Sequence, residues 1–326
     1  MKQKVLITGG AGFIGSRLVE KLLCQDLEVH VLDVMPLEKA YRLKNISQNK
    51  DLIYTQGDLR DKKQLSNWYQ KDATHLYHLA SVVGVQNYIS DPLSLIDIVV
   101  VGTRNLLELA SKYGTRVLFT STSEIYAKNP NTPWSESDDR VLGPTSIDRW
   151  SYSSSKAVCE HMLFALFRSS NLKFTIVRFF NVYGPGQAPI FVVSKSLYQV
   201  LKNESPFLYD SGEQTRCFTF VDDAIEGVIV ASRSEKAIGE AFNIGSNIET
   251  TMKNAIDLII KISGKDVDIK SFETLKEYGE KYEDIPKRIP NVSKAKNVLN
   301  WEASTSFEEG IKASIQWCKH NSWWLK

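Results

Sequence analysis

The stretch that decides the fold of this chain is Val5-Leu6-Ile7-Thr8-Gly9-Gly10-Ala11-Gly12-Phe13-Ile14-Gly15. The apolar run at its start predicts a strand, and apolar residues at helical spacing predict a helix after it. Gly9, Gly12 and Gly15 let the backbone turn tightly, approach a pyrophosphate and pack the helix against the sheet. Free N–H groups at the start of the helix favour negative charge. The stretch therefore predicts a dinucleotide site of the Rossmann type, with Phe13 and Ile14 beside the cofactor.

A triphosphate-binding loop is the competing interpretation of these glycines. It needs the pattern Gly-x-x-x-x-Gly-Lys-Ser/Thr, in which the lysine reaches the phosphates. Gly10 and Gly15 have this spacing, but Ser16 occupies the position of the lysine. A nucleotide triphosphatase is therefore not expected.

Asp33 ends the next predicted strand, where a carboxylate would accept hydrogen bonds from the adenosine ribose. A carboxylate at this place repels a 2′-phosphate, so NAD is favoured over NADP. The alternative is that Asp33 is an ordinary turn residue at a strand end.

Strand-like and helix-like segments alternate through the first half of the chain. The strand-like segments are 4–8, 28–33, 52–54, 75–79, 116–120 and 174–179, and the helix-like segments are 13–24, 91–113 and 151–168. Such alternation is typical of βαβ units and of a parallel sheet covered on both faces. The predicted fold class is therefore α/β, a doubly wound parallel sheet of the Rossmann type with a smaller, interleaved α/β lobe.

The domain organisation follows from a change in this alternation after Val182. The run Tyr183-Gly184-Pro185-Gly186 breaks the chain at that point. We expect a dinucleotide-binding domain over 1–180 and a second lobe over 181–326, with 222–250 returning to the first domain.

The composition excludes several classes of protein. Of 326 residues, 43% are hydrophobic and 24% charged, which is ordinary for a globular protein and excludes intrinsic disorder. A net charge of +2 offers no strong field for nucleic acid or a membrane surface. The four cysteines lie far apart without a Cys-x-x-Cys pair, and the five histidines have no metal-binding spacing. We expect a cytoplasmic protein without a metal site, a nucleic-acid partner or a membrane segment.

A tyrosine and a lysine one helical turn apart are the first candidate catalytic pair. Tyr152 and Lys156 are at positions i and i+4, and so lie on one face of the predicted helix. A nearby ammonium and an oxidised nicotinamide would lower the pKa of the phenol, which could then take the proton of a hydroxyl whose carbon gives hydride to the cofactor. The pattern Tyr-x-x-x-Lys also arises by chance, usually as a solvated lysine beside a core aromatic residue.

Thr122, Ser123 and Glu124 follow the predicted fifth strand, at the carboxyl edge of the sheet where ligands bind. Thr122 could hydrogen-bond the same hydroxyl as Tyr152. Thr122 and Glu124 would point to one side if the strand geometry persists. The alternative for Glu124 is a solvated turn carboxylate.

These motifs together resemble the extended short-chain dehydrogenase/reductase family, and within it the nucleotide-sugar epimerases, dehydratases and decarboxylases. They run through most of the chain: Thr8–Gly15, Gly57-Asp58-Leu59, His78-Leu79-Ala80, Thr122 with Tyr152 and Lys156, Arg178–Pro185, Gln214–Asp222 and Arg288-Ile289-Pro290. The resemblance implies NAD as the cofactor, a nucleoside diphosphate sugar as the substrate, and a second lobe that binds this sugar nucleotide.

The resemblance also implies the roles of further residues. It places Asp58 and Leu59 at the adenine, Leu79, Ala80 and Ser81 beside the cofactor, and Asn181, Arg216 and Arg288 at the diphosphate or the sugar. An arginine suits phosphate because its planar guanidinium donates two parallel hydrogen bonds.

The chain departs from the family pattern at two positions. Val99 stands where the family has Asn in its Asn-x-x-Gly-Thr segment, so a polar contact near the cofactor is missing or supplied from elsewhere. Ala127 replaces the Gly of the family's Val-Tyr-Gly, which is a milder change.

The family's enzymes begin by oxidising the sugar at C4 and differ in the step that follows. Thr122-Ser123-Glu124, Gly143-Pro144 and Arg149-Trp150-Ser151-Tyr152 resemble the UDP-glucuronate decarboxylases, and Arg288 matches the arginine assigned there as proton donor. On this interpretation Ser123 and Glu124 flank C5 and C6. The first alternative is a UDP-sugar 4-epimerase acting on UDP-glucuronate or UDP-glucose. The second is a dehydratase, although Ser123 replaces the acid that a dehydratase uses.

A different class of function is a dinucleotide-sensing module that keeps the fold without the chemistry. Such a protein would be expected to lose Tyr152 or Lys156, and both are present. By analogy with relatives, the helices over 91–113 and 151–168 are expected to pair across a two-fold axis as a homodimer.

Overall fold

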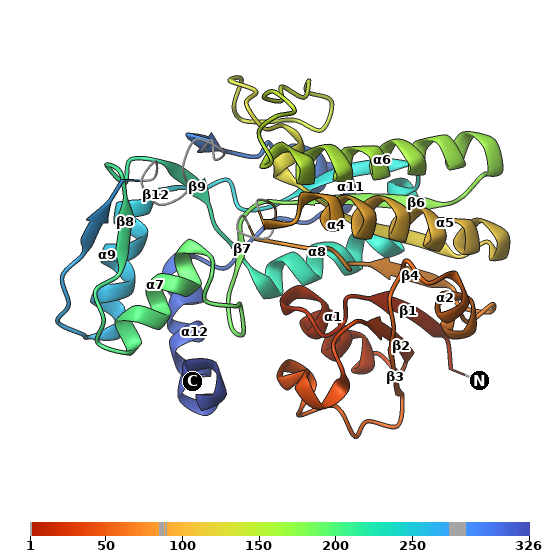
Figure 1. Ribbon diagram of the computed structural model, residues 1–326, viewed down its shortest axis with the longest axis horizontal. Helices are drawn as coiled ribbons and strands as arrows, with labels where there is room; N and C mark the ends of the chain where they lie inside the picture. The colour runs from red at the N-terminus through yellow and green to blue at the C-terminus, as the bar shows by residue number, and fades with distance from the viewer. Residues whose placement is uncertain (1, 85–87, 89, 274–284) are drawn as a thin grey trace.

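A seven-stranded parallel sheet forms the centre of the molecule, in a computed structural model that describes residues 2–84, 88, 90–273 and 285–326 (Figure 1). The strand order is β11-β6-β5-β4-β1-β2-β3. The bounds are β1 (Lys4–Thr8), β2 (Glu28–Asp33), β3 (Leu52–Gln56), β4 (His75–His78), β5 (Arg116–Thr122), β6 (Phe174–Phe179) and β11 (Glu240–Ile244). The order reverses direction beside β1, as in doubly wound folds, so the predicted fold class is confirmed.

Helices cover both faces of the sheet and bury the apolar side chains that its strands present on each side. One layer consists of α1 (Phe13–Leu23), α8 (Val221–Arg233) and α11 (Ser293–Leu299). The other consists of α2 (Lys62–Trp68), α4 (Pro92–Ile96), α5 (Gly102–Tyr113) and α6 (Trp150–Ser170). Figure 1 shows α4, α5 and α6 together on one side of the sheet.

The helix predicted over 91–113 is interrupted in its middle. Asp91 caps its start by accepting a hydrogen bond from Ser94 N, and Gly114 ends it in the left-handed conformation. Between α4 and α5, the residues Asp97–Val101 form a π-helical turn. Apolar spacing alone does not reveal such a turn, because it shifts the helical register only locally.

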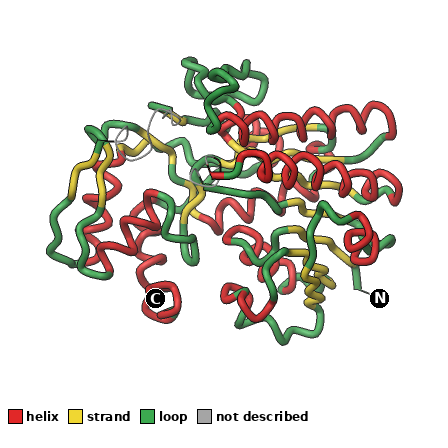
Figure 2. The backbone as a smooth tube through the Cα atoms, viewed as in Figure 1, coloured by secondary structure: helices red, strands yellow, loops and turns green. Residues whose placement is uncertain are grey.

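A smaller lobe packs around its own apolar core at one end of the sheet (Figure 2). Its helices are α7 (Val192–Leu201), α9 (Met252–Ser263) and α12 (Phe307–His320). Its strands are β7 (Val182–Tyr183), β8 (Phe207–Tyr209), β9 (Thr215–Cys217), β10 (Thr219–Phe220), β12 (Glu249–Thr251), β13 (Lys270–Phe272) and β14 (Lys287–Arg288). They pair as β12-β9-β14, β13-β8 and β10-β7.

The chain passes between the sheet and the smaller lobe more than once. After β10 it returns to the sheet as α8 and β11, and β11 pairs in parallel with β6. It then enters the smaller lobe again at β12 and α9. Short 3₁₀ turns complete the structure: η1 (Leu37–Lys39), η2 (Tyr41–Leu43), η4 (Ser123–Ile125), η5 (Glu235–Ala237) and η6 (Ser322–Leu325).

The C-terminal turn η6 connects the two parts of the molecule. The Trp323 ring stacks on Tyr41 of η2 with 5.6 Å between centroids. Arg42 Nε donates a hydrogen bond to Gly186 O at 2.7 Å, and its guanidinium lies over Trp323. The C-terminal tryptophan therefore has a packing role. Within the described ranges, no helix has the length and apolar character needed to cross a bilayer.

Candidate active site

A cleft of about 1420 Å³ lies between the sheet and the smaller lobe, at the carboxyl ends of the strands. Every site residue predicted from the sequence lines it, although these residues come from segments far apart in the chain. They are Gly9, Gly12, Phe13, Ile14, Gly15, Asp33, Asp58, Leu59, Leu79, Ala80, Ser81, Thr122, Ser123, Glu124, Tyr152, Lys156, Asn181, Arg216 and Arg288. Their individual roles remain predictions.

The glycine loop forms a cradle of bare backbone at one end of the cleft. Gly9 has φ +75°, and a Cβ there would lie 2.7 Å from Ala80 N. A Cβ at Gly15 would lie 2.1 Å from Gly9 O. Gly12 caps α1 without a side-chain hydrogen bond, so no side chain of the cap occupies the first-turn N–H groups. The loop therefore fits the pyrophosphate of a dinucleotide.

Asp33 lies beside this cradle at the end of β2. Its Oδ2 accepts a hydrogen bond from Ala11 N at 2.9 Å, and its Oδ1 accepts one from Met35 N at 3.0 Å. Asp33 thus fixes the turns around it, as the turn interpretation required. Because each carboxylate oxygen can accept a second hydrogen bond, it also fits a ribose diol.

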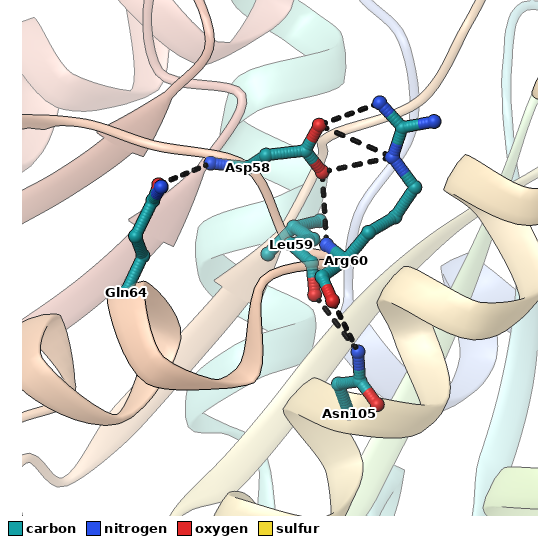
Figure 3. Close-up of polar contacts among 5 residues, drawn as sticks. All are labelled: Asp58, Leu59, Arg60, Gln64 and Asn105. Atoms are coloured by element: carbon teal, nitrogen blue, oxygen red, sulfur yellow. Dashed lines mark hydrogen bonds and ion pairs between the residues drawn. The ribbon is translucent and has the colours of Figure 1, made fainter.

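The loop of Asp58 and Leu59 is held by three neighbouring side chains (Figure 3). Arg60 donates to the Asp58 carboxylate from its backbone N at 2.8 Å and from Nη2 at 2.7 Å, which lowers the pKa of Asp58. Gln64 Oε1 accepts from Asp58 N, and Asn105 Nδ2 donates to Leu59 O at 3.1 Å. The loop therefore presents a fixed edge to the predicted adenine position.

Tyr152 and Lys156 are both buried on α6, and the lysine bonds to the end of β5. Lys156 Nζ donates to Thr120 O at 2.9 Å and lies over the Phe119 ring. Burial lowers the pKa of Lys156 to about 8, and burial together with the Glu124 charge raises the pKa of Tyr152. In the chain alone desolvation is the largest cause of this shift, and the lowering expected from the lysine together with an oxidised nicotinamide stays a prediction.

The backbone changes conformation directly after Thr122. The strand β5 ends there and η4 follows, so the extended geometry considered for Thr122 and Glu124 does not persist. Thr122 Oγ1 accepts a hydrogen bond from Glu124 N at 3.2 Å, and Ser153 Oγ donates to Glu124 O at 2.6 Å. These bonds hold η4 beside Tyr152, and Thr122 keeps its O–H for a ligand.

Glu124 is the centre of a buried arginine cluster. Its Oε1 lies 3.2 Å from Arg288 Nη1 and 3.6 Å from Arg149 Nη2. Arg216 lies beside Arg288, because the two are paired in register between β9 and β14. Burial alone would raise the pKa of Glu124, but the three guanidinium groups hold it below its usual value. The alternative of a solvated carboxylate is therefore wrong, and the cluster carries excess positive charge.

The family model described as GDP-mannose 4,6 dehydratase matches residues 6–314. The chain belongs to this family. The predicted resemblance to nucleotide-sugar epimerases, dehydratases and decarboxylases of the extended short-chain dehydrogenase/reductase type is thereby confirmed.

Similar proteins from this family include decarboxylases and an epimerase. The UDP-N-acetyl-alpha-D-glucosaminuronate decarboxylase of Bacillus cytotoxicus is 36% identical over 97% of this chain and 98% of that protein. UDP-glucuronic acid decarboxylase 1 of Xenopus tropicalis is 30% identical over 97% of this chain and 72% of that protein. The crystal structure of UDP-glucuronic acid 4-epimerase from Bacillus cereus, with UDP-glucuronic acid and NAD, is 25% identical with a TM-score of 0.85. It covers 98% of this chain and 100% of its own.

Among the cleft residues of this family member that were not assigned to the site from the sequence are Arg149, Tyr88 and Lys195. Arg149 precedes Tyr152 by three residues, and that helical spacing could have placed it near the pair. The Tyr88 ring stacks on Tyr152 with 4.7 Å between centroids. Lys195 on α7 lies 3.2 Å from Tyr209 Oη and over the Phe207 ring. The last two contacts are tertiary and left no signal in the sequence.

The two departures from the family pattern have structural counterparts. Val99 is buried within the π-helical turn, and its carbonyl accepts a hydrogen bond from Cys159 Sγ at 3.3 Å. Ala127 adopts φ +47°, a left-handed conformation that a glycine takes more easily.

Proposed function

We propose that this protein is an NAD-dependent decarboxylase of a UDP-linked uronic acid, with UDP-glucuronate as the first candidate substrate. The observation that carries the proposal is the cluster of Arg149, Arg216 and Arg288 around one ionised carboxylate, Glu124, beside Tyr152. Its positive excess fits a substrate with a carboxylate on the sugar as well as a diphosphate.

The cofactor end of the cleft fits NAD. The glycine loop would hold the pyrophosphate, Asp33 the adenosine ribose, and the Asp58–Leu59 loop the adenine. NAD held by these residues would supply the acceptor, and later the donor, of the hydride at C4 of the sugar.

Tyr152 and Thr122 act on the C4 hydroxyl. Tyr152 takes its proton as C4 is oxidised, and the Thr122 hydroxyl holds the oxygen in place. Because the chain alone raises the pKa of Tyr152, the phenolate needs the positive charge that bound oxidised NAD adds to the site. Lys156, with a pKa of about 8, is mostly protonated at neutral pH and supports the phenolate.

Oxidation at C4 turns a uronic acid into a β-keto acid, which loses carbon dioxide. The C5–C6 bond breaks, its electron pair forms the C4 enolate, and a proton is then added at C5. Arg288 and Arg149 would stabilise the carboxylate and then the enolate oxygen, and Arg288 is the candidate donor of the C5 proton. Glu124 stays ionised and orients Arg288.

A UDP-sugar 4-epimerase is the second candidate, because the Bacillus cereus epimerase structure has the same fold over nearly the whole chain. A dehydratase is third, since Ser123 stands where an acid is needed. The decarboxylase is preferred because the curated relatives that match 97% of this chain are named as decarboxylases of UDP-linked uronic acids.

Incubation of the purified protein with NAD and either UDP-glucuronate or UDP-N-acetylglucosaminuronate tests the proposal. Release of carbon dioxide and a decarboxylated nucleotide in the mass spectrum are expected. The product mass also distinguishes a UDP-pentose from a UDP-4-keto-pentose. A C4 epimer of unchanged mass with no gas would establish the epimerase instead, and no turnover of either substrate would reject both.

We further propose that the protein is a cytoplasmic homodimer. Leu93, Ile96 and Val101 of the α4–α5 segment and Val158 of α6 are exposed apolar residues on neighbouring elements. Such a surface fits pairing with a second copy of the chain. The four free cysteines support a reducing compartment.

A further inference from the structure

Asn243 is a fully buried residue of β11 that uses both ends of its side-chain amide. Its Nδ2 donates to Trp134 O at 2.9 Å and to Asn291 O at 3.3 Å. Its Oδ1 accepts a hydrogen bond from Tyr126 Oη at 2.8 Å. Although the cleft lies nearby, Asn243 is not among the residues that line it.

The Nδ2 donor of Asn243 connects it to the segment that follows Arg288. Trp134 N donates to Ile289 O at 2.8 Å, and Asn291 N donates to Trp134 O at 2.7 Å. Two backbone hydrogen bonds, one donated and one accepted by Trp134, therefore join this residue to the segment that follows Arg288. Asn243 fastens this joined pair to the central sheet.

The Oδ1 acceptor of Asn243 connects it to the turn that carries Glu124. Tyr126 follows Glu124 by two residues at the end of η4. Its hydroxyl donates to Asn243 and accepts from Arg178 Nη1 at 2.8 Å. Arg178 is itself held by a two-pronged ion pair with Glu160, at 3.1 and 2.6 Å. Tyr126 therefore has no freedom to shift without breaking buried polar contacts.

We propose that Asn243 is a positioning residue that sets the placement of Arg288 against Glu124. It links the two segments that carry this ion pair, whose Nη1–Oε1 distance is 3.2 Å, to one point on the rigid sheet. The proposal rests on the proposed function, because it matters only if Arg288 acts on the sugar. Loss of the amide leaves the oxidation machinery of Tyr152 in place but allows Arg288 to move.

A double-mutant cycle between Asn243→Ala and Arg288→Lys tests this coupling, with decarboxylation and C4 oxidation measured separately. Oxidation is followed in a single turnover by the absorbance of the reduced nicotinamide. Asn243→Ala is expected to lower the decarboxylation kcat about tenfold or more while oxidation changes little. In the Arg288→Lys background it should cause almost no further loss, because the residue that it positions is already impaired.

Two more variants keep the test decisive. Asn243→Asp keeps the acceptor for Tyr126 and loses both amide donors. It should therefore reproduce the Asn243→Ala phenotype if the hydrogen bonds from Nδ2 to Trp134 O and Asn291 O position Arg288. Asn105→Ala is the matched control, since Asn105 is also buried and donates to two carbonyl oxygens, but at the adenine end of the cleft. Its effect should appear in the affinity for NAD and multiply with that of Arg288→Lys.

The outcomes separate the two proposals. If the wild-type protein releases no carbon dioxide from any UDP-linked uronic acid, the proposed function fails. If the wild type is active and the losses of Asn243→Ala and Arg288→Lys multiply, the positioning role is overturned. It is also overturned if both Asn243 variants only lower the melting temperature and keep kcat below that temperature.

Discussion

Burial shifts the pKa values of both Tyr152 and Lys156, which lie one helical turn apart on α6. Their spacing correctly placed them on one helix face in the cleft, yet Lys156 bonds to Thr120 O and burial raises the pKa of Tyr152. The sequence could not show this, because desolvation depends on the surrounding residues from distant segments. Glu124 and its arginines illustrate the same point, since the contact of Glu124 with Arg288 joins η4 to β14.

The phenol of Tyr152 is the candidate proton acceptor, so its removal should stop oxidation of the sugar. Tyr152→Phe is expected to lower turnover by about a hundredfold or more, while NAD still binds. Turnover is measured by mass spectrometry and NAD affinity by calorimetry. Tyr113→Phe on α5, outside the cleft, is the control. Unchanged turnover in Tyr152→Phe would remove Tyr152 from the proposed role.

The buried ammonium of Lys156 makes a prediction for stability against pH. Its pKa falls from 10.5 to about 8 on folding, so between these values the unfolded chain binds more protons than the folded protein. The contribution of Lys156 to the free energy of unfolding should therefore rise with pH through that window, by about 3 kcal/mol in total.

Denaturant unfolding of the cofactor-free protein and of Lys156→Met, in a series from neutral to alkaline pH, measures this effect. The unfolding free energy of the wild type minus that of Lys156→Met should rise by this amount across the window, since the two proteins share all other titrating groups. A difference that does not vary across the window would contradict the burial of a titrating ammonium.

At the scale of elements, the strand–glycine loop–helix unit is almost wholly local, and the sequence predicted it well. The bounds of β1 and β2 match the prediction, and α1 ends within one residue of it. The π-helical turn of Asp97–Val101 and the turn η4 were not predicted. Both depend on contacts of the surrounding helices and strands, which local spacing does not encode.

The glycine loop also makes a prediction at this scale. A Cβ at Gly15 would lie 2.1 Å from Gly9 O, which is backbone and cannot move aside cheaply. Gly15→Ala should therefore distort the loop and weaken NAD binding by more than about tenfold. Gly264→Ala is the matched control, because Gly264 has φ +67° but nothing within 4 Å. It should cost about 1 kcal/mol of stability and leave NAD affinity unchanged. If both variants bound NAD with equal affinity, the glycine loop would not be the binding site of the pyrophosphate.

At the scale of the whole molecule, the exposed apolar residues on α4 and α6 predict a dimer. Replacing Leu93 and Val158 together by glutamate places charges within the proposed interface and should give a folded monomer. Light scattering after size exclusion measures the mass. Ile248→Glu alters an equally exposed apolar residue in the smaller lobe and should leave the dimer intact. A monomeric wild type would contradict the proposal.

The return of the chain to β11 has a consequence for synthesis on the ribosome. The edge of β6 that β11 covers stays open until Glu240–Ile244 have been translated, after much of the smaller lobe has emerged. An apolar strand with an open edge is a template for pairing with other chains. Nascent chains that stop before residue 240 should therefore be the ones most prone to aggregate and most dependent on chaperones.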